Sequence, residues 1–165
     1  MITNYFSPLE FIVSVKKLPN VEFFTQAVNI PSLSITPMEQ QTPFRPIQLP
    51  GSRISYGDLP ISFIIDEGMN NYIEVYNWMN GLAPSEDFSD YSSVYGGKDG
   101  LGGPLTDITI IAMNSHKNPN IEFVFKDCFP ANLSDIVLDT TQSDVIYPQA
   151  TVTFIFKNFT INKLT

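Results

Sequence analysis

Hydrophobic and polar residues alternate along several short segments of the chain, which is the pattern of β-strands that bury one face. FIVSV at residues 11–15 is one such segment, and ISFIID at 61–66 is a second. TDITIIAM at 106–113 and IEFVFKD at 121–127 predict two strands joined through NSHKNPN, a composition typical of a hairpin turn. These segments predict a mainly β protein.

Two longer segments predict further strands. PNVEFFTQAVNIP, residues 19–31, is bounded by prolines and predicts a broken strand, because proline is confined to the ends and edges of strands. QATVTFIFKNFTI, residues 149–161, has the most regular alternation in the chain. It predicts one strand whose Val152, Phe154 and Phe156 face the core.

One segment has the period of a helix. Between about residues 70 and 82, apolar side chains recur every three or four positions and therefore share one face: Tyr72, Val75, Tyr76, Met79 and Leu82. Asn71 and Glu74 fit a polar capping box at its start, and Gly81 fits a left-handed cap at its end. The sequence thus predicts one helix that flanks a β-structure.

Two long stretches have neither period. Residues 36–60, TPMEQQTPFRPIQLPGSRISYGDLP, are rich in proline, and compact domains seldom contain so long an irregular stretch without a functional reason. We expect a projecting, extended loop or hairpin here, with Pro50-Gly51-Ser52 at its tip. Residues 83–104 are polar and rich in glycine, and we expect a flexible loop there.

The composition is that of one folded domain. The chain has 165 residues, of which 43% are hydrophobic, and we expect residues 1–165 to form a single domain. It carries 17 acidic and 9 basic residues, a net charge of −8, without the basic cluster that nucleic-acid binding requires. The single cysteine excludes an intramolecular disulfide and agrees with folding in a reducing cytoplasm. Because the chain has neither a long apolar run nor the pattern of a signal peptide, we expect no stable membrane insertion.

The residues that most often carry chemistry have structural explanations. Asp66 and Glu67 are neighbours whose side chains diverge, and acids before a helix face its positive end. His116, the only histidine, lies in a turn without a nucleophile motif, and Cys128 is expected to be a small buried residue. GGKDGLGG, residues 96–103, lacks the ending of a phosphate-binding loop. We therefore expect no catalytic residue, no cofactor and no metal site.

The order of these elements resembles the tail tube proteins of contractile-tailed, T-even-like bacteriophages. The resemblance runs from residue 18 to 82, through QAVNIPSL, then TPFRPIQLPG with ISYGDLPISFIIDE, then the helix NNYIEVYNWMNGL. It continues towards the C-terminus in CFPANLSDIVLDTT and ATVTFIF. Its specificity lies in the order and spacing of these motifs, and the segment 84–104 matches least well.

This resemblance implies a fold, a function and partners. The fold would be a small β-barrel or β-sandwich with one flanking helix, similar to that of the Hcp proteins of type VI secretion. Six-membered rings would stack into a hollow tube that conducts DNA and is driven through the host envelope when the surrounding sheath contracts. The partners would be other copies of the chain, the tail sheath protein, a baseplate tube-initiator and a tape-measure protein inside the tube. The location would be the tail of a virion, assembled in the host cytoplasm.

The resemblance also implies two sets of site residues. The projecting stretch would reach neighbouring subunits or rings, because exposed apolar side chains usually mark interfaces, and four are candidates: Phe44, Ile47, Leu49 and Ile54. The bore would be net negative so that it repels the phosphates of DNA. Three acids predicted on strands are candidates for its lining: Glu22, Asp107 and Glu122.

Other functions stay open at the level of sequence. A baseplate protein that initiates the tube, or a hub component of the same family, would have the same features. More distant alternatives are a phage glycan hydrolase with Asp66 or Glu67 as its acid, and a carbohydrate-binding β-sandwich. Self-assembly into tubes without a ligand would favour the tube subunit, and turnover of cell-wall glycans would favour the hydrolase.

Overall fold

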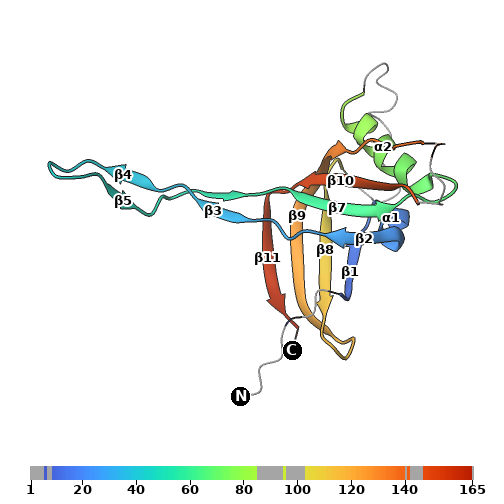
Figure 1. The fold of residues 1–165 in the computed structure, drawn as a ribbon, viewed down its shortest axis with the longest axis horizontal. Helices are drawn as coiled ribbons and strands as arrows, with labels where there is room; N and C mark the ends of the chain where they lie inside the picture. The colour runs from blue at the N-terminus through green and yellow to red at the C-terminus, as the bar shows by residue number, and fades with distance from the viewer. Residues whose placement is uncertain are drawn as a thin grey trace.

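The computed structural model describes residues 6, 9–84, 95, 103–139, 141 and 147–164, and strands predominate among them (Figure 1). The helices in this part of the chain are α1 (Pro19–Phe24) and α2 (Asn70–Leu82). The strands are β1 (Phe11–Val15), β2 (Thr25–Val28), β3 (Leu33–Ile35), β4 (Met38–Gln40), β5 (Ile47–Leu49), β6 (Ile54–Tyr56), β7 (Leu59–Ile64), β8 (Thr106–Met113), β9 (Pro119–Leu133), β10 (Gln149–Ile155) and β11 (Asn158–Lys163). The mainly β prediction is confirmed. Most of the predicted flexible loop lies outside the described residues.

Seven strands form one antiparallel sheet that bends into two layers through the long strand β9. Sheet 1 contains β1, β8, the first half of β9 and β11, and sheet 2 contains the second half of β9, β10, β7 and β2. The bend coincides with Asp127, whose left-handed φ of 55° is typical of a β-bulge. The strands of the two sheets cross at a steep angle in Figure 1.

The sheet is open rather than closed into a barrel. β1 and β2 stand at the two ends of the strand order, and no pairing joins them within the described residues. The chain passes from β1 to β2 through α1, which packs against β1 and α2. Of the two forms that the sequence predicts, the structure therefore has the layered one.

The inward side chains of both sheets form one hydrophobic core, which the two helices cover. Fully buried members come from sheet 1, sheet 2 and the helices alike: Val15, Ile108, Phe125, Ile61, Phe63, Val152, Phe154, Val21 and Val75. Burying each such side chain contributes about 1.5–3 kcal/mol, so this core is the main source of stability. Phe125, Phe156 and Phe159 form an aromatic cluster where sheet 1 meets the end of β10.

The start and end of α2 differ from the prediction, although its range agrees. The backbone of Asp66 to Met69 turns back, and Asp66 Oδ1 accepts the N–H of Asn71 at 3.3 Å, so an acid does face the positive end of the helix. Asn71 forms no capping box with Glu74. It is fully buried, and its amide donates to the carbonyl of Ile64 at 2.7 Å. Gly81 lies inside the helix, so it is not a left-handed cap.

The buried face of α2 is centred on Val75 and Trp78 rather than on the tyrosines. Tyr76, predicted to face the core, is 55% exposed, whereas Trp78 packs on Phe154 with ring centroids 6.0 Å apart. The indole Nε1 donates to the carbonyl of Pro104 at 3.1 Å, and Lys17 Nζ lies 5.2 Å from the indole centroid. Burial lowers the pKa of Lys17.

Two predicted strands are wrong in their extent. Residues 19–24 form α1, not the first part of a broken strand, because Pro19 occupies the start of a helix, where its missing N–H is tolerated. The predicted strand at 149–161 is two strands, β10 and β11. The chain leaves sheet 2 at Phe156 and Lys157, and the N–H of Lys157 donates to the carbonyl of Lys126 in sheet 1 at 3.0 Å.

Candidate assembly surfaces

Residues 33–56 form a projecting two-stranded arm, in which β3 pairs with β6 and, further out, β4 pairs with β5 (Figure 1). The predicted extended hairpin is thus confirmed. Every residue of these four strands is exposed.

Each half of the arm has an apolar and a polar face. In the inner half, two cross-strand pairs form the apolar face: Leu33–Tyr56 and Ile35–Ile54. Ser34 and Ser55 pair on the opposite face. In the outer half, three side chains share the apolar face: Met38, Ile47 and Leu49. Gln48 donates to Glu39 on the polar face at 2.9 Å.

The tip of the arm is residues 41–46, not the predicted Pro50-Gly51-Ser52. Thr42 Oγ1 donates to the carbonyl of Arg45 at 2.6 Å and accepts the N–H of Arg45 at 3.3 Å, which closes a turn. Phe44 lies within this turn and is 97% exposed. Gly51 instead faces the opposite strand, where an added Cβ would lie 1.8 Å from the carbonyl oxygen of Thr36.

All four predicted interface residues lie on the arm, with Phe44 at the tip, Ile47 and Leu49 on β5, and Ile54 on β6. The exposed fraction of each is 42% or more. The four candidates leave out four residues of the same apolar faces: Leu33, Ile35, Met38 and Tyr56. Their alternation is visible in the sequence, but their cross-strand partners depend on where the turn falls.

Tyr56 joins the arm to the core. Its ring centroid lies 5.6 Å from that of Phe156 and 5.6 Å from that of Phe159. Aromatic pairs at such distances contribute about 0.5–1.5 kcal/mol beyond their burial. The inner apolar face of the arm therefore continues from the aromatic cluster of the core.

The face of sheet 1 that points away from the core holds two of the three predicted bore residues. Asp107 on β8 and Glu122 on β9 alternate with inward-facing neighbours. Asp107 Oδ1 accepts the N–H of Asp127 at 3.1 Å, and Glu122 Oε2 accepts the amide of Asn162 at 3.1 Å. Lys126 lies on the same face, so the described strands there carry a base among their acids.

Glu22 is not on this face. It lies on α1, and its Oε2 accepts the N–H of Val15 at 3.2 Å. The interpretation of residues 19–31 as a strand groups the Glu22 side chain with those of Asp107 and Glu122.

Sheet 1 ends in two edge strands. Among the described residues, β1 pairs with β8 alone and β11 pairs with β9 alone. Because β1, β8, β9 and β11 are successively antiparallel, β1 and β11 run in opposite directions. The unpaired N–H and C=O groups of such edges are templates for pairing with another chain.

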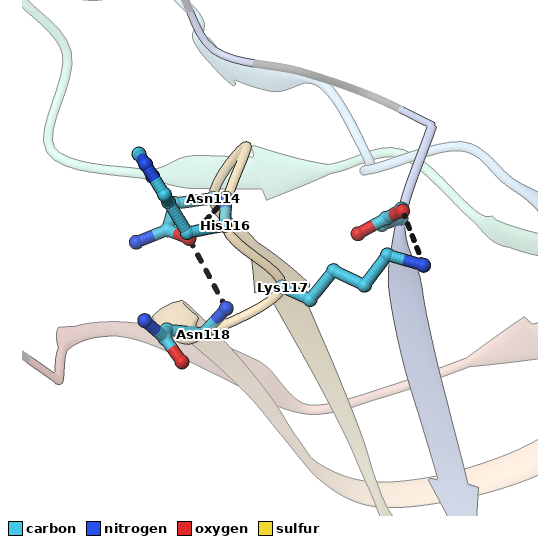
Figure 2. Close-up of polar contacts among 5 residues, drawn as sticks. Asn114, His116, Lys117 and Asn118 are labelled. Carbon is cyan, nitrogen blue, oxygen red and sulfur yellow. Dashed lines mark hydrogen bonds and ion pairs between the residues drawn. The ribbon is translucent and has the colours of Figure 1, made fainter.

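The only histidine lies in the turn between β8 and β9 (Figure 2). Asn114 Oδ1 accepts the N–H groups of His116 and Asn118, at 2.9 and 3.1 Å. Lys117 has a left-handed φ of 62°, and its ammonium lies 3.4 Å from Glu10 Oε1. Both side chains of this ion pair are exposed, and such pairs contribute about 0–1 kcal/mol to stability. Residues 114–118 thus form a turn that is held mainly by the Asn114 side chain.

Cys128 is fully buried, as predicted, and burial raises the pKa of its thiol to about 12. No cluster of potential metal ligands occurs within the described residues. In the same part of the chain, neither helix is long and apolar enough to cross a membrane. GGKDGLGG lies outside the described residues except for its last glycine.

Comparison with known proteins finds likeness in structure rather than in sequence. No protein-family profile matches the sequence, and no curated protein matches it. A chain from the tube-terminating cap of the anti-feeding prophage superimposes with a TM-score of 0.69 at 16% identity, covering 99% of this chain and 94% of that one. A chain from the sheath–tube complex of PVC, an extracellular contractile injection system, gives 0.68 at 16% identity, covering 97% and 93%.

Hcp1 of Salmonella typhimurium is also similar, with a TM-score of 0.51 at 10% identity over 93% of this chain and 85% of that one. At identities this low, structural likeness shows the fold alone, and the function needs other arguments. The chain has the fold found in the tube and cap assemblies of contractile injection systems and in Hcp.

Proposed function

We propose that this chain is the repeating subunit of the tail tube of a contractile-tailed bacteriophage. Copies form six-membered rings that stack into a hollow tube. The observation that carries the proposal is the arm, each half of which exposes an apolar face. Such a face is a liability on a monomer and is accounted for when another copy covers it.

The edges of sheet 1 support closure of a ring. Rotation about an axis keeps the strand direction of each copy, so β11 of one copy would meet β1 of the next in antiparallel orientation. The alternation of directions would then continue unbroken around the ring. Repeated head-to-tail contacts close into rings when the rotation permits, and they build filaments when it does not.

In this arrangement the outward face of sheet 1 lines the bore, and residues 1–165 act as one tube domain. DNA passes through without specific binding, and a tape-measure protein occupies the bore before ejection. The sheath protein surrounds the tube, a baseplate protein initiates it, and the assembly is part of the virion. The presence of Lys126 among the acids of this face supports a weakly rather than strongly anionic lining.

A role at the end of a tube is the second candidate. The likeness to a tube-terminating cap favours it, because the same fold then serves in an assembly that stops growing. A baseplate initiator would equally form one ring or a few. The length of the assemblies separates these roles from that of the repeating subunit.

Asp66, one of the two acids that the hydrolase alternative would use, has a structural role. Both carboxylate oxygens of Asp66 accept hydrogen bonds from the start of α2, one from Asn71 N–H and one from the Asn70 amide at 2.8 Å. Asp66 is thereby committed to holding the helix. We propose that the chain is not an enzyme.

Electron microscopy of the purified protein at high concentration tests the proposal. We expect hollow tubes of variable length with sixfold symmetry in cross-section. Single rings or short stacks of fixed height would instead favour the cap or initiator role. A protein that stays monomeric at all concentrations would contradict both.

A further inference from the structure

We propose that the arm tip of one copy docks into an apolar groove at the opposite end of the next copy, with Phe44 as the anchor. The end groove is lined by Phe24, Ile65, Met69, Ile136, Leu138 and Tyr147, with Asp66 and Glu67 beside them. Arg45, next to Phe44, would face these acids. The inference rests on the proposed self-assembly and names the surface that receives the arm.

The tip is built as a rigid anchor. The reciprocal hydrogen bonds between Thr42 and Arg45 hold the turn, and Pro43 and Pro46 restrict the backbone on both sides of the Phe44–Arg45 pair. A segment that is already ordered loses less conformational entropy when it binds. Aromatic residues and arginine are also the residue types most enriched among binding hot spots. A Phe44 side chain that is 97% exposed on such a turn is therefore placed for insertion into a partner.

The end groove has the matching chemistry. Its lining is largely apolar, and Tyr147 and Leu138 are exposed in the single chain, by 68% and 88%. Met69 stands in it with a left-handed φ of 54°, which is rare for a residue other than glycine, asparagine or aspartate. Backbone strain of this kind concentrates at ligand and partner sites. The flexible thioether of methionine adapts readily to an inserted ring.

The charges on the two surfaces are complementary. The chain has a net charge of −8, yet both of its arginines, Arg45 and Arg53, lie on the arm, which contains a single acid, Glu39. A neighbouring depression shares Leu138 and Tyr147 with the end groove and adds Asp135 and Asp139. No described residue lining either depression is basic. Opposite charges of this kind orient two partners and set the register of their contact.

The positions of the two surfaces allow a repeating contact. β7 continues from the arm and runs away from it, so the end of β7 and the start of α2 lie at the far end of the molecule from the arm tip (Figure 1). A tip that meets a groove on the opposite end makes a head-to-tail contact, which can repeat from copy to copy.

Two other apolar depressions fit the tip less well. The depression between β1 and β2 contains Glu10, whose charge is already balanced by Lys117. The depression beside α1 contains Glu22, whose carboxylate accepts the N–H of Val15. In the end groove Asp66 is likewise engaged by the start of α2, but Glu67 has no hydrogen-bond or ion-pair partner among the described residues, so it is the better match for Arg45.

Disulfide trapping between two singly substituted proteins tests the contact. R45C and E67C are purified separately, mixed, allowed to assemble and oxidised. A disulfide requires the two Cα atoms to lie within about 7 Å of each other, so the bond reports direct proximity. The native Cys128 is fully buried and stays silent. We expect a covalent dimer on a non-reducing gel in the mixture, at several times the yield of either protein alone.

The matched control is R53C mixed with E67C, which removes the same charge from the arm but not at the tip.

A charge exchange gives an independent readout. We expect R45E to raise the concentration needed for assembly about tenfold, equivalent to about 1.4 kcal/mol, and R45E/E67R to restore assembly. If tubes form but the R45C–E67C mixture yields no more dimer than the control, this docking site is wrong and the tube function stands. If the unsubstituted protein forms no assemblies, the proposed function fails as well.

Discussion

At the scale of single residues, Cys128 shows how burial sets both chemistry and stability. Its thiol is fully buried, and this burial raises its pKa from an ordinary 9.0 to about 12, with Asp107 and Asp127 acting in the same direction. In the unfolded chain the thiol loses its proton near pH 9, while in the folded protein it keeps it. The unfolded state therefore binds fewer protons between pH 9 and 12, and the free energy of unfolding falls as the pH rises through this range.

We predict that raising the pH from 8 to 10.5 lowers the free energy of unfolding of the unsubstituted protein by about 2 kcal/mol more than that of Cys128→Ala, since each pH unit above 9 contributes about 1.4 kcal/mol. Urea unfolding at the two pH values, followed by the fluorescence of the single Trp78, measures the difference. All other residues are the same in the two proteins, so their contributions to the pH dependence cancel. Equal losses in the two proteins would show that the thiol is not protected by burial.

At the scale of elements, alternation predicted the strands whose one face is buried, and it failed where another constraint dominates. β1, β8 and β10 bury alternate residues, so their periods are visible in the sequence. α1 has six residues, too few to display a helical period, and only Val21 is buried in it. Pro50-Gly51 has the composition of a turn tip, but Gly51 is required for a close approach to Thr36 instead. The sequence contains no signal for this approach, because it depends on strands paired across the arm.

For the arm we predict that Gly51→Ala prevents assembly while leaving the domain folded. The new Cβ would lie 1.8 Å from the Thr36 carbonyl oxygen, so the two strands of the arm must separate at this point and the tip is displaced. The exposed arm strands contribute little to the core, and we expect the melting temperature to change by no more than about 4 °C, which corresponds to roughly 1 kcal/mol or less. Analytical ultracentrifugation and circular dichroism measure the two effects.

Ser52→Ala is the matched control, because it changes the neighbouring exposed residue without placing an atom near Thr36. We expect it to assemble like the unsubstituted protein. Normal assembly of Gly51→Ala would mean that the position of the tip is not needed for contacts between copies.

At the scale of the whole molecule, the candidate surfaces were partly predictable. The exposed apolar side chains of the arm could be located because no strand or helix period accounts for them. The proposed lining of the bore could not be located, because the outward face of sheet 1 draws on strands that are distant in sequence. Net charge gives no information on its distribution, and Lys126 lies on the same face as Asp107 and Glu122. We therefore expect a bore with a small excess of negative charge rather than one lined by acids alone.

We predict that Glu122→Lys converts assembled tubes from DNA-excluding to DNA-binding. The substitution raises the net charge of the face by two in each copy, and six copies in a ring would each present the added lysine. Bound phosphates release counterions, so the retention of a short DNA duplex should be strong at about 50 mM salt and lost at about 500 mM. Co-sedimentation with the tubes measures it, and resistance of the retained DNA to a nuclease places it inside the bore. Asp58→Lys, which makes the same charge change at an exposed site off sheet 1, should retain little protected DNA. Equal protection in both variants, or none in Glu122→Lys tubes, would mean that another surface lines the channel.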